Sequence, residues 1–143
     1  MAGKSDTFEN DLLKLIFNAT AIANISDNAA SSPLTNLFVA LHTADPTDSG
    51  TQTSNEVAYT SYARVAVART SGGWTVTGNS VSPVATINFP ACTGSTATAT
   101  HFSVGVASSG GSKILYAGSL TPSISISTGV TPQLTTASTI TED

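Results

Sequence analysis

The histidines and the nearest acid are the residues of this chain that could act together in chemistry. His42, Asp45 and His101 could bind a metal ion or, with a serine, form a nucleophilic triad. Their spacing fits neither arrangement. The histidines are not placed at i, i+2 or i, i+4, which would preorganise a metal site, and no G-x-S-x-G turn presents a serine. We therefore expect no catalytic residue, no metal ligand and no cofactor.

Two weaker motifs lead to the same expectation. Gly3-Lys4-Ser5 resembles the end of a phosphate-binding loop, but the strand and first glycine of that motif have no room upstream. Asp27, Asp45 and Asp48 lack the D-x-[DN]-x-[DN]-G spacing of a calcium loop. We interpret these acids as turn formers.

Hydroxyl groups replace charges over most of the chain. Between Thr70 and Thr141 the one formal charge is Lys113, and serine and threonine recur on alternate positions. Charged residues make up 10% of the sequence, against about a quarter in ordinary soluble domains. Threonine suits a pleated, half-hydrated strand surface, whereas an enzyme cleft needs titratable groups. The composition predicts a β-rich, non-enzymatic protein whose surfaces make contacts.

Charge and hydropathy exclude two classes of partner. The net charge is −4 and there are only five lysines and arginines, so the chain lacks the basic patch that displaces counterions from nucleic acid. No apolar run approaches the ~20 residues that span a bilayer, and early acids argue against a signal peptide. Cys92 is the single cysteine, so no intramolecular disulfide forms. We expect a soluble protein made in a cytoplasm.

The N-terminal part predicts an amphipathic helix over residues 6–25. Asp6 is placed as the N-cap, with Glu9 completing a capping box. Helical periodicity puts seven apolar residues on one face: Phe8, Leu12, Leu15, Ile16, Ala19, Ile22 and Ala23.

Leu13 and Phe17 lie outside that predicted face. We expect them to be buried against another chain, with a homodimer as the simplest soluble form. The alternative is that the segment 28–33 covers them within the monomer.

From residue 35 to 141 the apolar period is two, which predicts short strands. Expected strands are 37–41, 62–69, 74–77, 85–89, 102–106, 114–116, 123–127 and 134–140, with Gly72-Gly73 as a hairpin turn. About eight short antiparallel strands with glycine and proline between them predict a β-sandwich or jelly roll. Residues 1–143 are expected to form a single domain.

Arg64 and Arg69 form the local basic cluster of this β region. They follow Tyr59 and Tyr62 in the chain, and Glu56 is nearby. One interpretation is an ion pair at the rim; the other is a contact patch, because arginine and tyrosine are enriched at interfaces. The sequence leaves both open.

Several stretches, taken in order, resemble a family of small virion proteins of tailed bacteriophages, described as head-decoration or tail-fibre-like proteins. They are Leu37–Pro46, Asn55–Val57, Tyr62–Arg64, the Trp74 hairpin, Ile87–Pro90 and Thr100–Phe102. The resemblance extends from about Leu37 to Leu120.

The resemblance implies a structural virion protein without enzymatic activity, and a jelly-roll fold like that of some phage cement proteins. Compactness, acidity and spare apolar helix surface favour a capsid cement protein. Such a protein would bind the major capsid protein on the outside of the head and stabilise it. The alternative is a tail-fibre or receptor-binding module, in which Trp74, Tyr59 and Tyr62 would stack on sugar rings.

Overall fold

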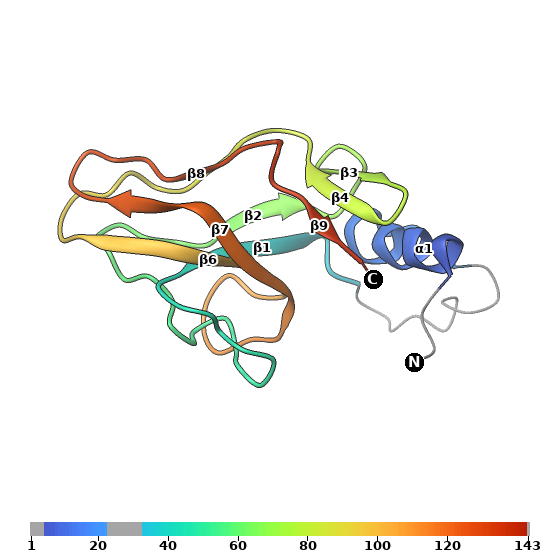
Figure 1. Cartoon of the computed structure of the whole chain (residues 1–143), viewed down its shortest axis with the longest axis horizontal. Helices are drawn as coiled ribbons and strands as arrows, with labels where there is room; N and C mark the ends of the chain where they lie inside the picture. Colours follow the sequence, from blue (N-terminus) through green and yellow to red (C-terminus); the bar gives the residue numbers. More distant parts are fainter. Residues whose placement is uncertain (1–4, 23–32, 143) are drawn as a thin grey trace. The chain divides into compact units, whose positions relative to one another are not determined.

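The computed structural model describes residues 5–22 and 33–142, and this part of the chain is mainly β. It has one helix and nine strands (Figure 1). They are α1 (Asp6–Asn18), β1 (Asn36–His42), β2 (Val65–Ala68), β3 (Trp74–Thr77), β4 (Ser80–Pro83), β5 (Ile87–Asn88), β6 (Ala97–Gly105), β7 (Ile114–Ile126), β8 (Gln133–Leu134) and β9 (Ile140–Thr141). The predicted mainly β class with one N-terminal helix is confirmed.

The chain divides into two compact units. Unit 1 contains Met1–Asn36, Val67–Thr86 and Thr135–Asp143, and unit 2 contains Leu37–Ala66 and Ile87–Leu134. Each unit is therefore built from separate stretches of chain. Whether the two unfold together, as the expected single domain would, stays a prediction.

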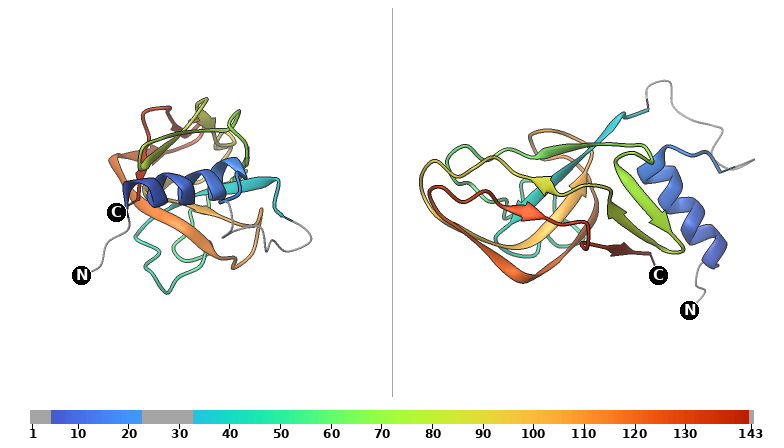
Figure 2. Two further views of the ribbon diagram at one scale, coloured as in Figure 1. Left: turned by 90° about the vertical axis from the view of Figure 1, so that its right-hand side faces the viewer. Right: turned by 90° about the horizontal axis from the view of Figure 1, so that it is seen from above.

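Unit 2 is organised around a sheet with the strand order β2-β1-β6-β7 (Figures 1 and 2). β1 pairs antiparallel with β6, with Leu41 opposite Phe102 and His42 opposite His101. Four consecutive residues, Val39 to His42, are buried, so both faces of β1 are covered. This confirms the central strand that its continuous apolar run predicts. β5 and β8 form a separate two-stranded pair.

Unit 1 packs α1 against β3 and β4, which form an antiparallel sheet with β9 (Figure 2). Ser5, not Asp6, is the N-cap: its side chain accepts a hydrogen bond from Phe8 N at 3.4 Å. The helix ends at Asn18 because Ala19 adopts a left-handed conformation (φ 53°) as its C-cap. The predicted end at 25 is wrong, because residues 19–22 are not helical; residues 23–25 lie outside the described residues.

The buried face of α1 is also not the predicted one. Leu13 and Phe17 are fully buried, whereas Phe8 is 41% exposed. Phe17 packs edge-on against Trp74, with ring centroids 4.8 Å apart, and this contact sets the rotation of the helix. The premise that Leu13 and Phe17 are spare surface for another chain is therefore wrong.

Within the described residues, no helix is long and apolar enough to cross a membrane.

The strands differ from the prediction in bounds and in pairing, and the largest differences are one missed strand, one merged pair and one divided strand. β3 pairs with β4, a strand that the sequence pattern did not predict, and not with β2 across Gly72-Gly73. The turn between β3 and β4 contains Gly78, whose φ of 60° suits glycine. The two predicted strands 114–116 and 123–127 are one continuous strand, β7. The predicted strand 134–140 is divided between β8 and β9.

Candidate functional site

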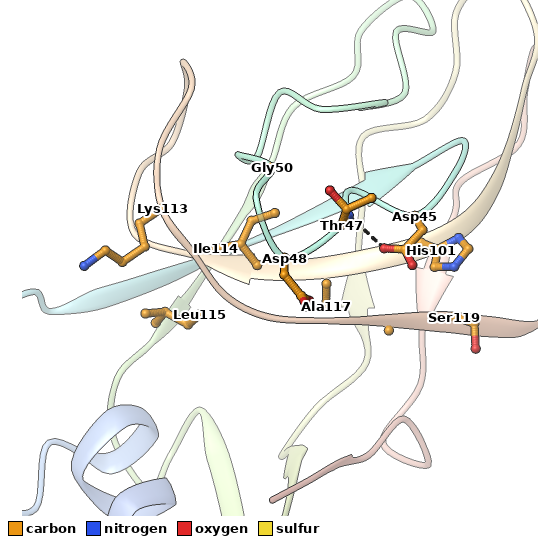
Figure 3. Close-up of a pocket in the computed structure, with 11 residues that line it drawn as sticks. Asp45, Thr47, Asp48, Gly50, His101, Lys113, Ile114, Leu115, Ala117 and Ser119 are labelled. Atoms are coloured by element: carbon orange, nitrogen blue, oxygen red, sulfur yellow. Dashed lines mark hydrogen bonds between the residues drawn. The ribbon is translucent and has the colours of Figure 1, made fainter.

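A groove of about 550 Å³ lies in unit 2 between the loop after β1 and the first half of β7 (Figure 3). Asp45 and Asp48 line it from the loop, His101 from β6, and Leu115, Ala117 and Ser119 from β7. Figure 3 places Lys113 at one end of the groove, with Asp45 and Ser119 at the other. The groove therefore has a basic end, an acidic end and a short β segment between them.

Hydrogen bonds of Asp45 stabilise the loop that carries Asp45 and Asp48. Asp45 Oδ1 accepts a hydrogen bond from Thr47 N at 2.8 Å, and Asn55 Nδ2 donates to Asp45 O at 3.0 Å. Asp45 thus has a turn-forming contact, as expected. In residues 5–22 and 33–142, no three His, Cys, Asp or Glu side chains lie close enough together to hold a metal ion. Asp27, Gly3 and Lys4 lie outside the described residues.

His42 is part of the interior of unit 2. Its Nδ1 lies 2.8 Å from Ser54 O, and its Nε2 lies 2.8 Å from Ser103 Oγ. A carbonyl oxygen only accepts, so Nδ1 carries the proton and neutral Nε2 accepts from the Ser103 hydroxyl. Burial lowers the pKa of His42 below its ordinary 6.5. His42 is a satisfied core histidine; His101, opposite it on β6, lines the groove instead.

Arg64 is the centre of a buried polar network. Its Nε donates to Glu56 Oε1 at 2.7 Å and its Nη2 to Glu56 Oε2 at 2.8 Å. It also donates to the carbonyl oxygens of Ala107 at 3.0 Å and Gly110 at 2.9 Å. Charge-assisted bonds to Glu56 raise the pKa of Arg64, so the guanidinium stays charged. Arg64 connects three segments of unit 2.

Gln52 extends this network, although no pattern in the sequence predicts that it does. The side chain is fully buried: Nε2 donates to Phe38 O at 2.9 Å, and Oε1 accepts from Ser112 Oγ at 2.7 Å. Gln52 belongs to a polar stretch that the sequence presents as a solvated loop. The close approach of Gly105 to this amide could not be foreseen either.

Arg69 has a different function from Arg64. Its Nε donates to Ile16 O and its Nη2 to Leu15 O, both at 2.6 Å, and its Nη1 donates to Leu34 O at 3.1 Å. The last turn of α1 contains no basic residue of its own. Arg69 supplies the missing cation at the helix C-terminus, where carbonyl groups lack intrahelical partners.

Of the three aromatic residues expected to stack on sugars, Tyr59 and Trp74 are interior and Tyr62 is half-buried. Tyr59 is 3% and Trp74 2% exposed. Tyr59 donates to Pro90 O at 2.8 Å, and burial raises its pKa to about 12. Tyr62 donates to Glu56 Oε1 and accepts from Leu41 N, both at 3.0 Å. For Tyr59 and Trp74 the expectation of a sugar-stacking surface is wrong, because these rings are buried inside their own units.

The six predicted contact residues do not come together at one surface. Arg64, Tyr62 and Tyr59 are held inside unit 2, while Leu13, Phe17 and Arg69 belong to unit 1. Arg64 and Glu56 do pair, as one of the two interpretations expected, but in a largely buried position: the two side chains are 2% and 16% exposed. Their polar groups bind the protein itself.

The fold and the interior define a class: a mainly β protein in which His42, Arg64 and Arg69 stabilise its own loops and helix. The chain matches a protein family over residues 3–141, and the family is described as podophage GP4 fiber I protein gp80. The chain therefore belongs to this family of phage virion structural proteins, and the predicted resemblance to such proteins is confirmed. No curated protein matches the chain.

Proposed function

We propose that the protein is a non-enzymatic structural component of a podophage virion fibre. The observation that carries this proposal is the family match, which covers nearly the whole chain and is described as a fibre protein. The family match therefore supports the fibre, the alternative location, better than the capsid surface. Attachment to the major capsid protein as a cement on the outer surface of the head is the competing assignment.

The interior supports a structural role. His42, Arg64 and Arg69 are three groups whose chemistry a catalyst could use, and each is bound to backbone or side-chain atoms of its own unit. Such a network costs desolvation and favours a single rigid arrangement of loops. A fibre component needs rigid loops because they present contact surfaces in fixed positions.

Location and copy number in the particle test the proposal. Purified virions are examined by electron cryomicroscopy and quantitative mass spectrometry, with the major capsid protein as the internal standard. We expect density for this chain in fibres and a copy number far below that of the capsid protein. Density spread over the shell, with a copy number near that of the capsid protein, would establish the cement assignment and overturn the fibre one.

A further inference from the structure

β7 is an edge strand of unusual length. It spans 13 residues, and in the described chain no strand pairs with it on the side away from β6. The mean strand in globular proteins has about 5–6 residues. An unpaired edge presents backbone donors and acceptors in a row, which is a template for another extended chain.

The first half of β7 lacks two of the features that normally prevent such pairing, although its register with β6 shifts between Val104 and Gly105 and between Ala99 and His101. Proteins protect edges with charged side chains, prolines, β-bulges or very short strands. From Ile114 to Thr121 there is no charged residue and no proline; Pro122 comes only after this stretch. Ala117 and Ser119 are exposed there, while Leu115 and Leu120 are half-buried. The opposite edge of the same sheet, β2, has only four residues.

Charge selects the occupant of this edge. An uncharged strand does not discriminate among partners by itself, but the groove beside it has Lys113 at one end and Asp45 at the other (Figure 3). In an antiparallel pair around a two-fold axis, each Lys113 is carried toward the Asp45 end of the other copy. In this arrangement the two lysines lie far apart, and each is brought toward the acidic end of the other copy's groove. A second copy of this chain therefore fits the edge both in hydrogen bonding and in charge.

We propose that β7 pairs antiparallel with β7 of a second copy and joins two four-stranded sheets into one continuous sheet. This interface differs from the helix contact expected from the sequence, because Leu13 and Phe17 are buried. Strand addition at a sheet edge is a common mode of recognition, in which backbone hydrogen bonds provide much of the affinity. The inference does not depend on where in the virion the protein is located.

The test compares one substitution on the two edges of the same sheet. Ala117 on β7 and Ala66 on β2 are both exposed alanines. We expect the unmodified protein to sediment as a dimer at micromolar concentration. Ala117→Lys places two like charges near the two-fold axis and should raise the dimer Kd at least about tenfold, whereas Ala66→Lys should leave it unchanged. Circular dichroism verifies that both variants are folded.

Charge reversal gives a second measurement. Lys113→Asp and Asp45→Lys should each weaken self-association, and an equimolar mixture of the two variants should form heterodimers. A monomeric wild type, or a dimer that Ala117→Lys leaves intact, would overturn the proposal. Loss of assembly in both alanine variants would instead indicate head-to-tail pairing of β7 with β2, and would equally overturn the two-fold arrangement.

Discussion

Arg64 and Glu56 face each other as two forks, with Nε 2.7 Å from Oε1 and Nη2 2.8 Å from Oε2. The pair lies eight positions apart in the chain and is largely buried, with Arg64 at 2% side-chain exposure. Because the same guanidinium also holds the carbonyl groups of Ala107 and Gly110, one side chain ties the 52–56 loop to the 107–112 loop.

Replacing Arg64 by methionine should therefore destabilise unit 2. The change leaves the Glu56 carboxylate buried without its cation, and the loss from breaking one side of a buried pair is about 3–5 kcal/mol. Chemical denaturation measures it. Arg64→Met combined with Glu56→Leu should recover part of the loss, because the unpaired charge is also removed. A single variant as stable as wild type would mean that the network contributes nothing to stability.

Gly105→Ala should also destabilise the protein. A Cβ at this position would overlap the amide group of Gln52, whose side chain is fully buried and bonded to Phe38 and Ser112. The amide cannot move without losing those bonds, which costs about 1–3 kcal/mol when a buried polar group is left unsatisfied.

Gly72→Ala is the matched control for this substitution. A Cβ there would meet only Thr70 Oγ1, at 3.6 Å, which is an ordinary contact. We expect thermal denaturation to show a clear loss for Gly105→Ala and little change for Gly72→Ala. Equal effects of the two would contradict the steric argument.

Acidification should weaken the fold through His42. Its folded pKa lies below the ordinary 6.5, so the unfolded chain binds the proton more readily. The stability from the neutral imidazole is complete above about pH 6.5 and is lost as the pH falls toward the folded pKa, with a slope of up to about 1.4 kcal/mol per pH unit. Urea unfolding between pH 5 and pH 8 measures this slope.

His42→Asn is the comparison for this pH effect. Asparagine has no titrating group, so the variant should be less stable at pH 8 but show a shallower fall between pH 6.5 and pH 5. If wild type and variant have the same pH dependence, His42 is not the group responsible.

Periodicity in the sequence predicted the strands well where local pattern and tertiary packing agree. Alternation of apolar residues predicted the bounds of β3, Trp74–Thr77. The continuous apolar run predicted that both faces of β1 are covered. The buried face of the helix was predicted wrongly. Helical periodicity favours the face with the most apolar residues, whereas the packing of Phe17 against Trp74 buries the row of Glu9, Leu13 and Phe17. The roles of Arg64 and Arg69 depend on partners 35 to 54 residues distant as well as on Glu56. No local pattern encodes such pairs.

The interleaved chain path leads to a final prediction on cooperativity. Neither unit is a continuous segment. The segments of each unit are separated by chain that belongs to the other unit, so we expect each unit to form only when that intervening chain is also folded. Wild-type protein should therefore unfold in one transition. The chain provides separate probes: its single tryptophan, Trp74, is in unit 1, and its three tyrosines, Tyr59, Tyr62 and Tyr116, are in unit 2.

Arg69→Met tests that cooperativity directly. It removes the cation that bonds the carbonyl groups of Leu15 and Ile16 at the end of α1, a contact confined to unit 1. Loss of such a helix-terminal interaction costs up to about 2 kcal/mol. In a single cooperative domain, Trp74 fluorescence and the tyrosine near-ultraviolet circular dichroism should shift to lower denaturant together. If only the tryptophan transition moves, the two units unfold independently and the single-domain prediction is wrong.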